Sequence, residues 1–189
     1  MTFIQKFLQS ENIIHVGEFK KKENNVNLID FTWSITNEIK KDRRGRVYFF
    51  IELDSEQNSK LIKIGKSSDK NGLGGTIGFY INTLSGTPSI TRFCVHHLIG
   101  NKLDEGKRIL VYCKFSESVK KEIVAFFEKK TLEIPLDITY IEEFCLEEYY
   151  EHFSEYPEWN FQEGGKQIPL NLIESYTIFI DNKRKKRIQ

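Results

Sequence analysis

The chain has 189 residues, enough for one ordinary globular domain, and its formal net charge is +1. It contains no apolar run near the roughly 20 residues that cross a bilayer, and its first residues lack the pattern of a secretion signal. Its cysteines, Cys94, Cys113 and Cys145, form neither a disulfide framework nor a zinc-binding pattern, so we expect a protein of the reduced cytoplasm.

Charged residues are distributed unevenly along the chain, although the net charge is only +1. Basic residues form clusters at 20–22, 40–46 and 183–187, and acidic residues gather at 142–158. Such a separation is typical of a phosphate-binding face on a nearly neutral protein, although solvated surface charge explains each basic cluster about as well. A disordered tail is a further explanation of the last cluster.

From the N-terminus, residues 1–44 form a predicted accessory region with apolar positions at 3–8 and 31–35. The next segment, 46–53, is dense in β-branched and aromatic residues, which favours a strand buried on both faces. A polar turn leads to a second strand at 61–65, so the two segments are predicted to form a β-hairpin.

Beyond the hairpin, we expect a flexible turn at 72–75 and then an apolar segment at 77–84, which is a helix or a loop leading into one. Short apolar runs predict strands at 93–95 and 109–113.

Ser118 is a favourable N-cap for a further helix. The apolar stripe of that helix would comprise Val119, Ile123, Phe126 and Phe127, at the spacing of one helical face.

An extended stretch at 136–141 and a helix from about 142 to 153 complete the predicted elements, and Pro157 stops that helix. The order of elements predicts an α+β fold, in which a small antiparallel sheet is flanked by helices and preceded by an N-terminal extension. The predicted division is 1–44 for the accessory region, 45–160 for the core and 161–189 for a C-terminal extension with a basic tail.

Tyr48 and Lys63 are the first residues that could carry chemistry. If the hairpin pairs as predicted, they lie on neighbouring strands and share a face. A nearby ammonium would stabilise a phenolate and lower the pKa of Tyr48 toward that of a usable general base. Each residue also has a purely structural explanation, as a buried tyrosine bonded to a carbonyl and a lysine at the sheet edge.

Glu147 follows an apolar triplet on the last predicted helix and is a candidate metal ligand. Mg²⁺ is commonly held by one or two carboxylates together with waters and phosphate oxygens. Glu143 and Glu148 are rivals for this role, and any of the three could simply be solvated. His96 and His97 are expected on a strand with their side chains on opposite faces, so we interpret them as structural.

Together these residues resemble the GIY-YIG endonucleases, and more narrowly their small type II restriction enzymes, over about residues 45–160. Gly45-Arg46-Val47-Tyr48 resembles the first half of the motif, and Lys63-Ile64-Gly65-Lys66-Ser67 resembles the second half with a lysine replacing its tyrosine. Glu147 falls at the family's metal-binding glutamate, and the segment Tyr156-Pro157-Glu158-Trp159-Asn160 is also similar.

The resemblance implies that Tyr48 activates water and that Glu147 holds one divalent cation, Mg²⁺ or another such as Mn²⁺. It also implies an arginine that stabilises the transition state, with a tyrosine one helical turn later. Tyr80 matches that tyrosine, but Thr76 stands at the arginine position. Three explanations are open: an inactive variant, replacement by Arg92 from another element, or a different helix register.

The leading hypothesis is a Mg²⁺-dependent, sequence-specific DNA endonuclease that acts as a homodimer on two-fold symmetric double-stranded DNA. Two alternatives are a DNA-binding protein of the same fold that does not cut, and a protein-interaction domain in which Tyr48 and Lys63 are structural. In the leading hypothesis the accessory region and the basic tail embrace the duplex. The residues predicted to contact DNA are Arg43, Arg44, Arg46, Lys66, Ser67 and Arg92.

Overall fold

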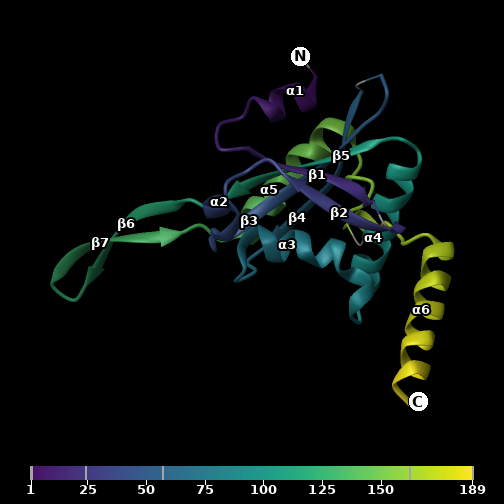
Figure 1. Cartoon of the computed structure of the whole chain (residues 1–189). Helices are drawn as coiled ribbons and strands as arrows, with labels where there is room; N and C mark the ends of the chain where they lie inside the picture. Colours follow the sequence, from purple (N-terminus) through teal and green to yellow (C-terminus); the bar gives the residue numbers. More distant parts are fainter. Residues whose placement is uncertain (1, 24, 57, 162, 189) are drawn as a thin grey trace.

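A five-stranded antiparallel sheet forms the centre of the protein, in the strand order β2-β1-β5-β3-β4 (Figure 1). The computed structural model describes residues 2–23, 25–56, 58–161 and 163–188. The strands of this sheet are β1 (Ile14–Lys22), β2 (Asn25–Trp33), β3 (Arg46–Leu53), β4 (Ser59–Ser67) and β5 (Arg108–Phe115). This small antiparallel sheet with flanking helices confirms the predicted α+β fold.

Helices cover both faces of this sheet. The helices are α1 (Phe3–Leu8), α2 (Asn37–Lys41), α3 (Gly72–Ile81), α4 (Ile90–Asp104), α5 (Ile138–Phe153) and α6 (Leu170–Ile188), with short 3₁₀ turns η1 (Thr83–Ser85) and η2 (Glu163–Gly165). Helices α3 and α4 pack on the face that carries Tyr48 and Phe50, whereas α1 and α5 pack on the face that carries Val47 and Phe49. Because β3 is an inner strand, paired with β5 and β4 and covered on both faces, seven of its eight residues are buried.

The hairpin of β3 and β4 is confirmed, and its register decides which side chains share a face. Tyr48 lies opposite Gly65, and Phe50 lies opposite Lys63. Residues directly opposite each other in an antiparallel pair point to the same side of the sheet. Tyr48 and Lys63 therefore share a face as predicted, and they are diagonal neighbours.

Two predicted elements have the wrong type. The run at 93–95 belongs to α4, whose N-cap Ser89 accepts a hydrogen bond from the backbone N–H of Arg92. A short apolar run does not by itself distinguish a strand from part of a buried helix.

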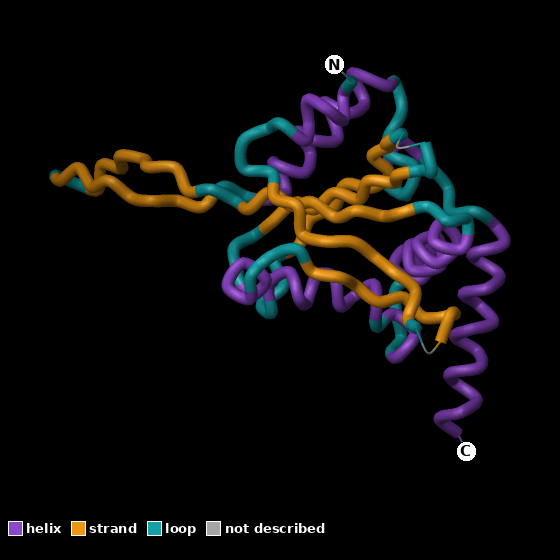
Figure 2. Tube along the Cα trace, turned by 45° about the horizontal axis from the view of Figure 1, so that its top comes forward, coloured by secondary structure: helices purple, strands orange, loops and turns teal. Residues whose placement is uncertain are grey.

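The predicted helix after Ser118 is instead a second hairpin, made of β6 (Ser118–Ala125) and β7 (Glu128–Pro135). Val119 and Ile123 are four residues apart, a spacing that places two side chains on one side of a helix and also of a strand. Phe126 and Phe127 form the turn of this hairpin. The hairpin extends away from the body of the protein in both views (Figures 1 and 2).

Two helix starts also differ from the prediction. The stretch at 72–75 is the first turn of α3 and not a flexible loop, and a side chain at Gly75 would overlap the carboxylate of Asp69. Helix α5 begins at Ile138, four residues before the predicted start, because Asp137 caps it through the N–H of Thr139.

Parts of both predicted extensions contribute to the main body. Strand β1, within residues 1–44, pairs with β5 and so joins the same sheet as the predicted core. In α6, Leu172 is buried in the core, and the hydroxyl of Tyr176 donates to the carbonyl of Pro88 at 3.0 Å. Among the described residues, no helix is both long and apolar enough to cross a membrane.

Candidate active site

Tyr48 lies at the centre of the candidate site, on β3, with its ring over Gly65 of the neighbouring strand. A Cβ atom at position 65 would lie 2.5 Å from both Cζ and the hydroxyl oxygen of Tyr48. Real Cβ atoms do not approach so closely, so a glycine at this position gives the tyrosine ring its place. The Gly in the second predicted half-motif therefore has a direct steric role.

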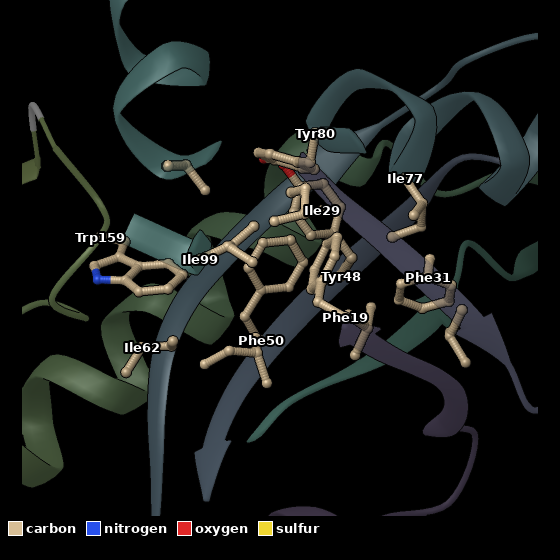
Figure 3. Packing of buried hydrophobic residues seen from close by; sticks show 14 of the residues in the cluster. Phe19, Ile29, Phe31, Tyr48, Phe50, Ile62, Ile77, Tyr80, Ile99 and Trp159 are labelled. Carbon is tan, nitrogen blue, oxygen red and sulfur yellow. The ribbon is translucent and has the colours of Figure 1, made fainter. Parts of the chain in front are cut away.

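The hydroxyl of Tyr48 meets the hydroxyl of Tyr80 from α3 at 2.7 Å, and each tyrosine is only 7% exposed. Figure 3 shows both tyrosines in one packed layer with Phe19 and Phe50. The carbonyl oxygen of Tyr80 lies 2.6 Å from Nδ1 of His96, a buried residue of α4. His96 thereby connects the end of α3 to α4 and holds Tyr80 in position.

Burial raises the pKa of Tyr48 to about 12 and raises the pKa of Tyr80 well above its usual value. The sequence predicted a lowered pKa for Tyr48, so this expectation was wrong. The cause is desolvation, which disfavours the phenolate more than its neighbours stabilise it. At neutral pH both tyrosines are therefore neutral hydroxyls that donate and accept hydrogen bonds.

Lys63 is 8% exposed, and burial lowers its pKa from 10.5 to about 8. The charges of Glu142 and Glu163 favour the ammonium and oppose part of that lowering. A buried lysine whose pKa lies near neutrality is a competent proton acceptor. Of Tyr48 and Lys63, Lys63 is therefore the better general base.

Glu142 of α5 is the carboxylate whose charge acts on these groups. It accepts an ion pair from Lys66 of β4 at 2.8 Å, and its charge acts on the pKa of Tyr48, Lys63 and Tyr80. Helix α5 packs on the opposite face of the sheet from α3, but β4 is an edge strand. A side chain at that edge can therefore influence groups on both faces.

Glu147, the predicted metal ligand, is not brought to this cluster. It is exposed on α5, five residues after Glu142, which corresponds to a position roughly 140° around the helix axis. The rivals Glu143 and Glu148 are exposed as well. Sequence reasoning missed Glu142, and its helical spacing to the buried Leu146 and Tyr149 was the signal that could have found it.

Thr76 lies one turn before Tyr80 on the buried side of α3, as expected, and is 1% exposed. Its hydroxyl donates to the hydroxyl oxygen of Ser67 on β4 at 2.8 Å. Ser67 thus fills the space beside Thr76, and the side chain is part of the packing between α3 and the sheet.

Arg92 is the arginine whose charge acts on Tyr80. It lies in the first turn of α4, over the ring of Phe79 at 5.6 Å, and it favours the phenolate of Tyr80. Its Nε atom is buried without a hydrogen-bond partner within the described residues, while the residue as a whole is partly exposed. Arg92 is therefore a partly exposed cation whose charge acts on Tyr80.

The other three arginines predicted to contact DNA differ in their exposure and in their partners. Arg43 is exposed and lines a cavity of about 560 Å³ together with Lys40, Lys41 and Lys70. Arg44 is paired with Asp42 at 2.7 Å. Arg46 is fully buried and donates from Nη2 to the carbonyl of Asp69 at 2.9 Å, so its guanidinium does not face solvent.

The donors at the cluster suit a hard cation with few protein ligands. No group of three or more histidine, cysteine or acidic side chains is placed to hold a metal in the described part of the chain. Glu142 is a carboxylate paired with Lys66, and Mg²⁺ is usually bound by one or two carboxylates together with waters and phosphate oxygens. Glu142 alone therefore suits Mg²⁺ better than zinc, which usually needs three or four protein ligands.

No protein-family model matches the sequence, and no curated protein matches it either. Among solved structures, the chain is similar to bacteriophage T4 EndoII, with 16% identity, 85% of this chain and 100% of that chain covered, and a TM-score of 0.48. It is also similar to the restriction endonuclease HPY188I in complex with product DNA, with 20% identity, 84% of this chain and 85% of that chain covered, and a TM-score of 0.42. Likenesses of this degree do not assign a function, so function is argued below from side chains.

Proposed function

We propose that this protein is a DNA endonuclease that hydrolyses phosphodiester bonds in double-stranded DNA. The observation that carries the proposal is the buried contact of Tyr48 with Tyr80, beside Lys63 on the same face of the sheet and within reach of the charge of Glu142. Three of these residues are the ones that the resemblance to GIY-YIG nucleases selects. A type II restriction enzyme of the GIY-YIG kind is the finer form of the proposal.

Lys63 is assigned the role of general base. Its neutral amine would take a proton from the attacking water, because its pKa of about 8 leaves a useful fraction unprotonated near neutral pH. The water oxygen then bonds to phosphorus, the bond from phosphorus to the leaving sugar oxygen breaks, and that oxygen takes up a proton. Tyr48 and Tyr80 would orient the water and the phosphate through their hydroxyls, which stay neutral.

Glu142 is assigned to the metal, with Mg²⁺ or Mn²⁺ as the ion. When bound, such an ion would polarise the phosphate and offset its negative charge. Lys66 pairs with Glu142 at 2.8 Å in this structure, and this ion pair would break when the carboxylate binds the metal. Lys66 is partly exposed, so its freed ammonium could contact the DNA backbone.

Arg92 is assigned the role of the arginine that stabilises the transition state, a role that Thr76 cannot perform. Its charge acts at Tyr80 and the residue is partly exposed, so its guanidinium could contact a phosphate oxygen. The cavity lined by Lys40, Lys41, Arg43 and Lys70 would hold a phosphate further along the backbone.

The test is nicking of supercoiled plasmid DNA in the presence of Mg²⁺. Glu142→Gln should lower the rate by at least roughly 10²-fold, the cost of removing one group that stabilises transition-state charge. Glu147→Gln is the matched control, since it makes the same change on the exposed side of the same helix and should leave the rate unchanged. If Glu147→Gln lowered the rate and Glu142→Gln did not, Glu147 would be the metal ligand. Full activity in both variants would refute the assignment of a carboxylate on α5.

A DNA-binding protein that does not cut is the second candidate, because Thr76 replaces the expected arginine. Restoring arginine at position 76 is a poor test, since Thr76 is buried against Ser67 and a longer side chain would disturb the packing. Arg92→Ala is a better one. If the unaltered protein nicks DNA and Arg92→Ala does not, the first candidate holds; if the unaltered protein binds DNA in a salt-sensitive way without nicking, the second holds.

A further inference from the structure

Helix α6 is fixed against the segment that joins α3 to α4. The hydroxyl of Tyr176 donates to the carbonyl of Pro88 at 3.0 Å, and Nζ of Lys183 donates to the carbonyl of Ser85 at 3.3 Å. Both acceptors lie between the end of α3 and the start of α4. Helix α6 therefore has a defined position on the protein, while its C-terminal end extends away from the sheet (Figures 1 and 2).

The same segment separates two residues that are assigned to the candidate site. Tyr80 is in the last turn of α3, and Arg92 is in the first turn of α4. The residue after Arg92 is Phe93. Its ring packs against those of Tyr176 and Phe179, with centroid distances of 5.4 and 5.2 Å. Helix α6 therefore packs on the end of the site at which Arg92 lies.

The last turns of α6 carry a run of positive charge that has few acidic partners within the described part of the chain. The run consists of Lys183, which is partly exposed, and the exposed residues Arg184, Lys185 and Lys186. Asp181 approaches Arg184 at 3.6 Å, whereas Lys185 and Lys186 form no ion pair with any described residue. The helix dipole favours cations at this end, but Lys183 and Lys186 repel each other at a spacing of three residues. The run is therefore a surface that a polyanion would neutralise.

A second group of cations lies at the other end of α3. Gly74, in the first turn of that helix, lines the cavity of about 560 Å³ together with Lys40, Lys41, Arg43 and Lys70. Helix α3 has ten residues and is roughly 15 Å long. Each strand of duplex DNA carries a phosphate about every 3.4 Å along the axis, so this length corresponds to roughly four base pairs. A duplex that runs along α3 would therefore meet one group of cations at each end of the helix.

We propose that the basic end of α6, residues 183–186, is a second DNA-binding surface, which holds the sugar–phosphate backbone on the Arg92 side of the candidate site. The cavity at the start of α3 holds the backbone at the other end, so the duplex lies along this helix. The contacts of α6 are made to phosphates and carry no sequence information of their own. The choice of DNA as the polyanion rests on the proposed function, whereas the surface rests on the position and the charge of α6.

The test is the affinity of the full chain for a short DNA duplex, measured by fluorescence anisotropy at several salt concentrations and without divalent metal, so that the DNA stays intact. The double variant Lys185→Gln, Lys186→Gln removes two charges and keeps residues that favour a helix. Its affinity should fall by roughly 10- to 60-fold at 0.1 M salt, because each phosphate contact contributes about 0.9 to the slope of log affinity against log salt. The slope itself should become smaller by about 1.8, and duplexes of unrelated sequence should show the same loss.

The matched control is the double variant Lys6→Gln, Lys20→Gln, which removes the same charge from exposed positions elsewhere. Lys6 belongs to α1, on the face of the sheet opposite α3, and Lys20 follows Phe19, whose ring lies on the α3 face. The control should leave the affinity and the salt slope unchanged. An equal loss in both double variants would show that only net charge matters, and it would overturn the proposal, as would an α6 variant that binds like the unaltered protein.

The number of duplexes bound per chain tests whether α6 and the cavity hold the same molecule. The α6 variant should bind DNA more weakly without changing this number, and a halved number would show that the two groups of cations bind separate duplexes and would overturn the proposal. If the variant changes the mass of the protein in solution and leaves its DNA affinity intact, the basic end binds a second copy and the proposal is wrong. Nicking is measured in none of these experiments, so a protein that binds DNA through α6 and never cuts it supports this proposal while it refutes the nuclease function.

Discussion

The hydroxyl oxygens of Tyr48 and Tyr80 lie 2.7 Å apart in a buried layer between β3 and α3. Each hydroxyl supplies a hydrogen-bond partner that the other needs in a place with little access to water. The pair therefore joins the first strand of the candidate site to the helix that follows its second strand. It serves the stability of the fold and the position of two candidate active-site groups at once.

Tyr48→Phe and Tyr80→Phe should each lower the free energy of unfolding by about 1–2 kcal/mol, because each leaves a buried hydroxyl without its partner. The double variant should lose less than the sum, since it leaves no unpaired hydroxyl behind. Urea denaturation of the three variants forms the required double-mutant cycle. Strictly additive losses would show that the two hydroxyls do not depend on each other.

Lys63→Arg should separate the two roles that a lysine can have at this site. Arginine keeps the positive charge but cannot act as a base near neutral pH. The nicking rate of the unaltered protein should rise with pH through about 8, where Lys63 loses its proton, and Lys63→Arg should lose both the activity and this dependence. A variant that stays active with the same pH profile would assign the base to another group.

Lys63→Met should raise the free energy of unfolding at pH 7, by about 3 kcal/mol at most, because it removes the cost of burying an ammonium. The folded-state pKa of about 8 lies below the ordinary 10.5, so the unfolded chain binds more protons at this site between these values. The stability contributed by this site therefore rises as pH increases from 8 to 10.5. Comparing the pH dependence of denaturation in the two proteins isolates that rise, which Lys63→Met should lack.

Gly65→Ala should displace the ring of Tyr48, since the added Cβ would lie 2.5 Å from its Cζ and hydroxyl oxygen. We expect a loss of about 1–3 kcal/mol in the free energy of unfolding, together with a loss of nicking. Gly86→Ala is the control, because a Cβ there has no atom within 4 Å. Thermal denaturation and the plasmid assay check both effects, and equal behaviour of the two variants would contradict the steric role of Gly65.

Asn160→Ala should weaken the edge strand of the sheet. The side chain of Asn160 accepts from the N–H of Ile64 at 2.9 Å and donates to the carbonyl of Ile64 at 2.8 Å. Losing two buried partners should cost about 2–3 kcal/mol and leave the edge of β4 free to pair with other chains. Denaturation and light scattering measure these effects. Asn160→Asp keeps the acceptor and should lose only part of the stability.

The hairpin of β3 and β4 was predictable because its cues are local: a dense apolar strand, a polar turn and a second apolar strand. Tyr48, Lys63 and Tyr80 could be chosen for the same reason, since each stands at a fixed distance along the chain from a recognisable motif. The segments at 93–95 and 118–127 were assigned wrongly. Short apolar runs and four-residue spacings fit helices and strands alike, and only the neighbours that cover them decide.

The sequence by itself determined the strand pair, the glycine of the second half-motif and the tyrosine one turn beyond Thr76. Only the tertiary structure decided which glutamate of α5 pairs with Lys66 of β4, because that depends on the rotation of the helix against the sheet. It also decided the state of the groups: burial, which no single residue encodes, keeps Tyr48 protonated and brings the pKa of Lys63 toward neutrality. The residues were visible along the chain, but their chemical roles depend on the packing around them.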